Sequence, residues 1–184
     1  NTFPEDKHVH RIEDVRTASV VMPVGVDLTP FMGTTADPDP HLIVWNHRWE
    51  HDKGPGELLA IVRALAERNL DFRMAMCGEV FVSVPPEFAE VTEFLGERLV
   101  HDGWAERHRY VDLLTRASVV LSTARQEFFG IGVVEGIASG AHPVLPKRLV
   151  YPERVAAIGG DSDEILYETP DEAADLIEAA LARE

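Results

Sequence analysis

The feature that most constrains the fold of this chain is a regular alternation of short apolar runs with amphipathic stretches. An apolar run without polar interruptions is typical of a strand that is covered on both faces of a sheet. The expected strands are 42–46, 72–77, 99–101, 118–122 and 141–145, with a short last one at 164–167. The expected helices are 57–69, 87–95, 106–116, 132–139 and 170–183, the last capped by Thr169, and 102–104 and 147–154 are expected loops. This order predicts an α/β fold with a three-layer, doubly wound parallel sheet of the Rossmann-like kind.

The length of the chain, 184 residues, is enough for one full-sized core. The chain begins with Asn1 rather than Met, and its opening stretch 1–16 is polar and charged. We therefore expect residues 1–40 to be a linker, with a strand at 18–22, that leads in from an amino-terminal domain outside this chain. Residues 41–184 are expected to form the Rossmann-like domain.

The composition argues against several classes of function. A net charge of -15 argues against direct binding of nucleic acid by this acidic piece, because a grip on phosphates needs clustered lysine and arginine. Cys77 is a single cysteine, so an internal disulfide or a multi-cysteine metal site is not expected. No apolar run approaches the roughly 18 residues of a membrane span. We expect a soluble, cytoplasmic protein without a membrane span.

Two cations stand in the loop after the first expected strand, where a parallel sheet binds ligands. Arg48 and Lys53 precede a helix whose N-terminus adds partial positive charge. Together they form a candidate clamp for a diphosphate, Arg48 through its forked donors and Lys53 as a point charge. The alternative is that both are solvated loop charges paired with Glu50 or Asp52.

Two carboxylates bracket a glycine-containing turn after the expected strand 118–122. Glu127 stands at the end of the strand, and Glu135 lies three residues into the expected helix. The turn 129–132 would point backbone N–H groups outward as an anion site, and the carboxylates could accept hydrogen bonds from sugar hydroxyls. The alternative is that Glu135 caps its own helix and that Glu127 is a surface charge.

Aromatic and imidazole side chains add weaker signals. The tryptophans Trp45, Trp49 and Trp104 lie in or beside these loops and could stack on a base or sugar, but core packing is at least as good an explanation. The histidines, including His47, do not fall at metal-ligand spacing, so surface or supporting imidazoles are expected. Motifs typical of dehydrogenases, nucleotide triphosphatases and serine hydrolases are absent from the sequence.

The two loop signals together resemble the carboxy-terminal half of the retaining GT-B glycosyltransferases of family 4. That family is similar in having an arginine and, five residues later, a lysine, here Arg48 and Lys53, and a pair of glutamates, here Glu127 and Glu135. The resemblance implies that Arg48 and Lys53 hold the diphosphate of a nucleotide-sugar, that Glu127 contacts the donor sugar and that Glu135 binds the ribose. Arg48, Lys53 and Glu127 would then be the catalytic residues. One departure is local, since Phe128 stands where the family usually has glycine.

The same resemblance implies further donor-binding residues. Phe129 stands in the turn, and Gly130 and Ile131 would give backbone N–H groups to phosphate or sugar. The loop with Gly103 and Trp104 resembles the one that meets the base. No divalent metal and no other cofactor would be required.

A narrower likeness, carried by stretches 45–50, 127–130 and 146–153, is to the tRNA-queuosine mannosyltransferases. It implies transfer of mannose from GDP-mannose to an acceptor, such as queuosine in tRNA, that is bound mainly by the amino-terminal domain. The isolated piece is expected to be inactive. The alternatives are a non-catalytic nucleotide-sugar-binding or interaction domain and a GT-B-like sugar-nucleotide epimerase; a phosphorylase would need a pyridoxal phosphate lysine, for which no motif is present.

Overall fold

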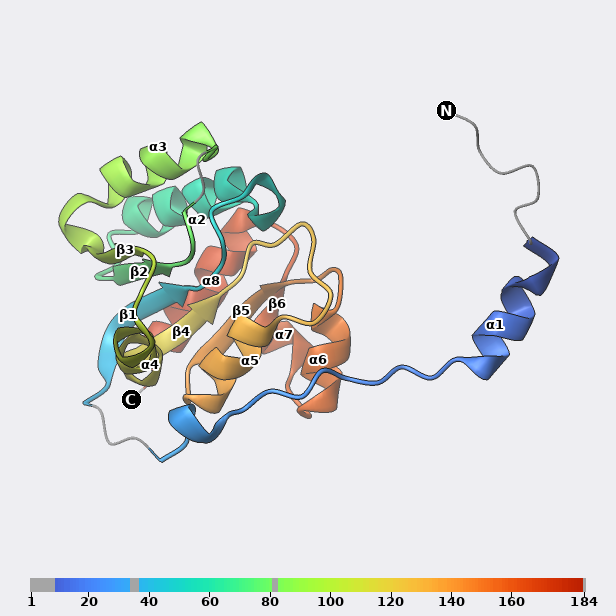
Figure 1. Ribbon diagram of the computed structural model, residues 1–184. Coiled ribbons are helices and arrows are strands. Elements are labelled where there is room, and N and C mark those ends of the chain that lie inside the picture. The colour runs from blue at the N-terminus through green and yellow to red at the C-terminus, as the bar shows by residue number, and fades with distance from the viewer. Residues whose placement is uncertain (1–8, 34–36, 81–82, 184) are drawn as a thin grey trace.

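A single parallel sheet of six strands organises the computed structural model, which describes residues 9–33, 37–80 and 83–183. Its strands are β1 Asp39–Trp45, β2 Arg73–Cys77, β3 Leu99–Gly103, β4 Ala117–Leu121, β5 His142–Pro146 and β6 Leu166–Tyr167. Their order across the sheet is β3-β2-β1-β4-β5-β6, so the chain winds outward in both directions from β1 and β4 (Figure 1). The predicted doubly wound parallel sheet is confirmed.

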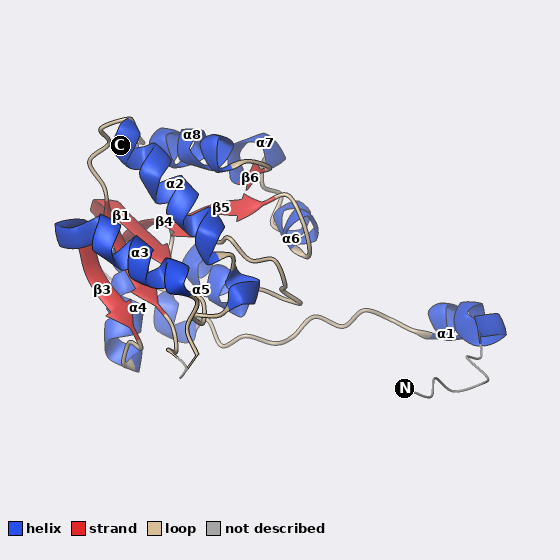
Figure 2. Cartoon of the chain, turned by 90° about the horizontal axis from the view of Figure 1, so that it is seen from above, coloured by secondary structure: helices blue, strands red, loops and turns tan. Residues whose placement is uncertain are grey.

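Helices cover both faces of the sheet (Figure 2). One face is covered by α2 Pro55–Glu67, α3 Pro86–Leu95 and α8 Pro170–Leu181, and the other by α4 Arg107–Arg116 and α5 Ile131–Ala138. Strand β1 shows why three layers form: Ile43 and Trp45 pack into the core on the α2 side, and Leu42 and Val44 into the core on the α4 side. All four side chains are almost completely buried, as a continuous apolar run predicts.

The amino-terminal part differs from the expectation. It begins with η1 Val9–Arg11 and α1 Ile12–Ala18, which lies well away from the sheet in both views (Figures 1 and 2). The predicted strand at 18–22 is wrong, because this segment continues from α1 as exposed chain that pairs with no strand of the sheet. A 3-10 turn, η2 Thr29–Phe31, follows, and the ring of Phe31 packs edge-on against the ring of Tyr110 with 6.1 Å between the ring centroids. Part of the expected linker therefore contributes to the core.

The loops differ in two places. Strand β3 runs on to Gly103, where a loop was expected from 102. The expected loop 147–154 contains the start of α6 Tyr151–Ala157, which is followed by α7 Ser162–Ile165. Proline in the first turn of α6 and burial of Tyr151 and Val155 one helical turn apart explain why this short helix forms.

The last helix forms as predicted. The Thr169 side chain accepts a hydrogen bond from the backbone of Glu172, whose side chain in turn accepts from the backbone of Thr169. Short 3-10 turns complete the fold, η3 His51–Lys53 and η4 Gly96–Arg98. Among the described residues, no helix combines the length and the apolar character needed to cross a membrane.

Candidate functional site

The candidate site lies where the loops after β1 and β4 meet, at the carboxyl ends of the two strands from which the sheet winds outward. This is the position at which open α/β sheets bind ligands. An open pocket of about 470 Å³ is lined there by Asn46, His47, Arg48, Lys53, Glu127, Phe128, Phe129, Ile131 and Gly132. The fold thus brings together the predicted cations, the first predicted glutamate and three residues of the predicted turn.

Backbone hydrogen bonds join the two loops directly. The carbonyl of Asp52 accepts from the N–H groups of Arg125 and Gln126, at 2.7 and 3.2 Å. In the other direction, the hydroxyl of Thr123 donates to the carbonyl of Lys53 at 2.6 Å. The position of Lys53 is therefore set by the loop that carries Glu127.

The two loops approach so closely that glycine is required between them. Gly54 has φ of +65°, and a Cβ atom there would overlap the backbone carbonyl of Thr123. The end of β2 makes a similar approach, since a Cβ on Gly78 would overlap the carbonyl of His47. A side chain at either position would fit only if the backbone moved.

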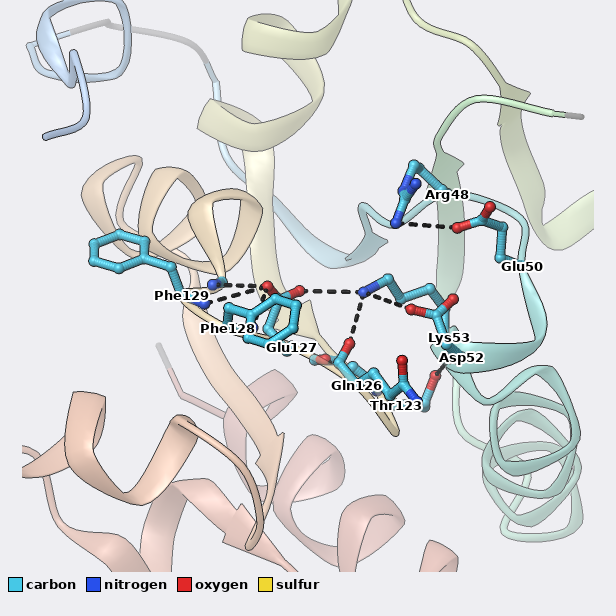
Figure 3. Close-up of polar contacts among 12 residues, drawn as sticks. Arg48, Glu50, Asp52, Lys53, Thr123, Gln126, Glu127, Phe128 and Phe129 are labelled. Atoms are coloured by element: carbon cyan, nitrogen blue, oxygen red, sulfur yellow. Dashed lines mark hydrogen bonds and ion pairs between the residues drawn. The ribbon is translucent and has the colours of Figure 1, made fainter. Parts of the chain in front are cut away.

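Lys53 is the buried cation of the site, with only 8% of its side chain exposed. Its Nζ donates to the carbonyl of Gln126 at 2.8 Å and lies 3.4 Å from Glu127 Oε2 and 3.3 Å from Asp52 Oδ2 (Figure 3). The pairing with Asp52 matches the alternative considered from the sequence, but Lys53 is not a solvated charge. An ammonium withdrawn from water in this way needs its three acceptors.

Arg48 stands at the rim of the pocket, with 53% of its side chain exposed. Its guanidinium forms an ion pair with Glu50 at 3.0 Å (Figure 3), which is the arrangement that the alternative described. An exposed pair of this kind is worth about 0–1 kcal/mol, so Arg48 can exchange Glu50 for another anion at little cost.

Glu127 caps the turn that follows it. Its Oε1 accepts from the backbone N–H groups of Phe128 at 3.0 Å, Phe129 at 3.4 Å and Gly130 at 3.1 Å (Figure 3). The alternative that Glu127 is a surface charge is therefore wrong. The expectation for Gly130 is corrected, because its N–H faces this carboxylate instead of pointing outward. Burial raises the pKa of Glu127, but the Lys53 ammonium and these N–H groups outweigh it, so the pKa lies below its usual value.

The two phenylalanines of the turn have opposite environments. The side chain of Phe128 is 95% exposed at the pocket, whereas the ring of Phe129 lies 4.1 Å from the guanidinium carbon of Arg154. The helix that follows, α5, begins at Ile131. The N–H groups of its first turn have no partner within the helix, because no helical carbonyl precedes them. The N–H groups that still fit the predicted anion site are those at the start of α5, and anion binding there stays a prediction.

Glu135 lies on α5 and reaches across to α4 instead of capping its own helix. The hydroxyl of Tyr110 donates to Glu135 Oε2 at 2.6 Å, and Arg107 lies 3.4 Å from Oε1. Sequence reasoning missed both partners, because α4 was read by its apolar spacing alone.

A second pocket, of about 210 Å³, lies beyond Glu135 at the ends of β2 and β3. It is lined by Cys77, Gly78, Trp104, Ala105, Arg107 and Tyr110. Trp104 is 68% exposed, and the adjacent Gly103 accepts a hydrogen bond from the N–H of Gly78 at 2.8 Å. Trp45 and Trp49 are instead buried in the core, whereas the ring of Trp104 is exposed at this pocket.

His47 is buried behind the main pocket. Its Nε2 finds no hydrogen-bond partner among the described residues. Burial lowers the pKa of His47 to about 4, and the nearby Lys53 ammonium acts in the same direction. The imidazole is therefore neutral at neutral pH. Of the two positions expected for the histidines, surface or supporting, its burial corresponds to the supporting one.

Comparison with known proteins places the chain among enzymes that handle sugars. Residues 32–184 match the family model of glycosyl transferases group 1. The chain is 38% identical, over 80% of its length, to the tRNA-queuosine alpha-mannosyltransferase of Drosophila melanogaster. It is 24% identical, over 84% of its length, to the GDP-mannose:cellobiosyl-diphosphopolyprenol alpha-mannosyltransferase of Xanthomonas oryzae pv. oryzae (strain PXO99A). It spans 41% of the length of each of these curated relatives.

Solved structures share the fold. The C-terminal domain of a glycosyl transferase group 1 family protein from Francisella tularensis superposes with a TM-score of 0.68 at 18% identity, over 86% of this chain and 89% of that one. Anabaena HepE, solved in complex with UDP and glucose, gives a TM-score of 0.69 at 17% identity, over 86% of this chain and 46% of that one.

Proposed function

The chain belongs to the glycosyl transferases of group 1, as its motifs predicted, and from this premise we propose that it is the donor-binding domain of a retaining hexosyltransferase. The proposed donor is GDP-mannose, and the proposed acceptor is queuosine in tRNA. The observation that carries the proposal is the approach of Lys53 Nζ to within 3.4 Å of Glu127 Oε2 in a pocket at the switch point of the sheet.

The cations of the pocket suit the chemistry of the leaving group. Departure of a nucleoside diphosphate builds negative charge on its phosphate oxygens, and fixed positive charge stabilises that transition state. Lys53 supplies such a charge from a position that the two loops determine, and Arg48 can add its forked donors when it leaves Glu50. We propose that these cations take the role that a divalent metal plays in other transferases.

Glu127 would act on the donor sugar. Its Oε1 is committed to the turn, whereas its Oε2 faces Lys53 at the pocket. The depressed pKa keeps the carboxylate ionised at neutral pH, so it can accept hydrogen bonds from sugar hydroxyls and stabilise positive character on the sugar ring. The contact with the donor sugar is the role that the family resemblance implies for Glu127.

The second pocket would hold the base. Trp104 offers an exposed ring for stacking. The guanidinium of Arg107 carries several N–H donors and no acceptor atom. Guanine presents two acceptors, O6 and N7, on one edge, whereas adenine presents an amino group in the place of O6. The donor character of Arg107 therefore supports guanine over adenine.

The acceptor would be bound mainly outside this chain. The relative with 38% identity is named for queuosine in tRNA, which supports that acceptor. The net charge of -15 does not favour direct binding of tRNA by these residues, so the rest of the full-length protein would supply most of that contact.

Calorimetric titration tests the donor site. GDP-mannose, UDP-glucose and ADP-glucose are titrated into the wild-type chain and into Arg48→Ala and Lys53→Ala, in buffer containing EDTA. We expect GDP-mannose to bind most tightly without metal and both variants to bind it at least tenfold more weakly. Binding of none of the three donors, or unchanged binding by both variants, would overturn the donor site. Incubation of the full-length protein with GDP-mannose and queuosine-containing tRNA then tests the acceptor, and a lack of transfer would refute it.

A further inference from the structure

Tyr110 on α4 forms a short hydrogen bond with Glu135 on α5. The hydroxyl lies 2.6 Å from Glu135 Oε2, a length typical of a charge-assisted hydrogen bond to a carboxylate. Tyr110 is largely buried, and burial together with the carboxylate raises the pKa of its hydroxyl, which therefore keeps its proton. The bond joins α4 to α5, and Tyr110 itself lines the second pocket.

Asn46 fixes the direction of this hydrogen bond. The Asn46 amide nitrogen donates to the carbonyl of Gly132 at 2.8 Å, and a carbonyl can only accept, so the orientation of the amide is determined. The same nitrogen donates to the hydroxyl of Tyr110 at 2.9 Å. Since the hydroxyl accepts from Asn46, its single proton is directed to Glu135.

The two oxygens of Glu135 consequently differ. Oε2 is committed to Tyr110, whereas Oε1 faces the guanidinium of Arg107 at the longer distance of 3.4 Å. Arg107 is an exposed side chain, so a ligand can share or replace its contact at low cost. Oε1 is thus the oxygen with free capacity to accept hydrogen bonds.

We propose that Tyr110 is a positioning residue: it locks Oε2 of Glu135 and thereby presents Oε1 to the vicinal hydroxyls of the donor's ribose. This role rests on the proposed function, in which the donor is a nucleotide-sugar. Without the tyrosine hydroxyl the Glu135 carboxylate loses the donor that fixes its orientation. The affinity for the ribose should fall, while the contacts to diphosphate and base remain.

Binding of GDP and of 2′,3′-dideoxy-GDP measured by calorimetry tests the role. We expect the wild type to prefer GDP, and Tyr110→Phe to bind GDP about tenfold more weakly with the dideoxy nucleotide changed less than twofold. Tyr151→Phe is the matched control, because it removes another largely buried hydroxyl, bonded to Ser122 at 2.7 Å, and should alter neither affinity. If Tyr110 had only a structural role, Tyr110→Phe would weaken the binding of both nucleotides equally.

The outcomes separate the two proposals. Equal weakening of both nucleotides by Tyr110→Phe, or no weakening of either, overturns the positioning role and leaves the donor site standing. A wild type that binds neither nucleotide overturns the proposed function and this role with it. If Tyr110→Phe fails to fold, Glu135→Gln takes its place: it should also abolish the preference for GDP, and a preference that survives in Glu135→Gln overturns the role.

Discussion

Lys53 and Glu127 are 74 residues apart in the sequence, yet Lys53 Nζ lies 3.4 Å from Glu127 Oε2. The Lys53 ammonium is held by the other loop, through the carbonyl of Gln126, whereas Glu127 is held by the N–H groups of its own turn. The pair is therefore a product of the fold and not of local sequence. Lys53 also lies 3.3 Å from Asp52 Oδ2, so a bound diphosphate would bring the lysine a third anionic partner.

Replacement of Lys53 by methionine should separate binding from stability. The variant keeps the length of the side chain but leaves Glu127 without its cation, so we expect the free energy of unfolding in urea to fall by about 1–3 kcal/mol. Affinity for GDP should fall at least tenfold. Lys147→Met is the control, since Lys147 forms an exposed pair with Glu168 and lies outside the main pocket. Equal effects of the two variants would contradict the special role of Lys53.

Substitution of Gly54 by alanine should destabilise the fold more than its backbone angle alone explains. Gly54 has φ of +65° and Gly159 has φ of +68°, but a Cβ at Gly54 meets the carbonyl of Thr123 whereas a Cβ at Gly159 meets nothing within 4 Å. We expect Gly159→Ala to cost about 1 kcal/mol and Gly54→Ala clearly more, with displacement of the loop that carries Lys53. Urea unfolding of both variants decides this, and equal costs would show that the contact is unimportant.

His47 should make the protein less stable as the pH falls toward 4. The folded pKa is about 4 and the unfolded value about 6.5, so between these values the unfolded chain binds the proton that the folded chain refuses. The free energy of unfolding therefore decreases with falling pH through this window, by about 3 kcal/mol at most. In His47→Gln this part of the slope should disappear. A slope that is the same in both proteins would mean that His47 titrates normally.

The two phenylalanines of the turn should respond differently to truncation. Phe128→Ala removes an exposed ring, so we expect the free energy of unfolding to change by less than about 0.5 kcal/mol. Phe129→Ala removes the ring that faces Arg154 and should cost about 1–2 kcal/mol. Thermal unfolding of both variants checks this. Destabilisation by Phe128→Ala would mean that its ring is covered in solution.

The sequence was sufficient for the sheet because every central strand carries an uninterrupted apolar run. The apolar run at 18–22 led to a wrong prediction of a strand, because within the described residues this segment pairs with no strand. The apolar runs also gave no prediction of α6. Proline in its first turn and the spacing from Tyr151 to Val155 are the signals that could have indicated it. Short helices of this kind give too few periods for spacing to be decisive.

The site was predictable in its members but not in their pairings. Arg48, Lys53, Glu127 and Glu135 follow from their places on adjacent loops, and their roles in binding remain predictions. The partners of Glu135 could not be foreseen, because Tyr110 and Arg107 reach it from α4 and no local pattern marks them. Likewise, no residue spacing reveals that Glu127 turns back onto its own backbone.

That return of Glu127 onto the turn has a consequence for selectivity. The carboxylate is an intramolecular competitor for the N–H groups of Phe128, Phe129 and Gly130, with an effective concentration on the order of millimolar or above. Free inorganic phosphate would have to outcompete it for these groups with a few contacts of its own. A nucleotide-sugar can leave it in place and bind through its many other groups, so the site would resist being filled by the small anions that surround it.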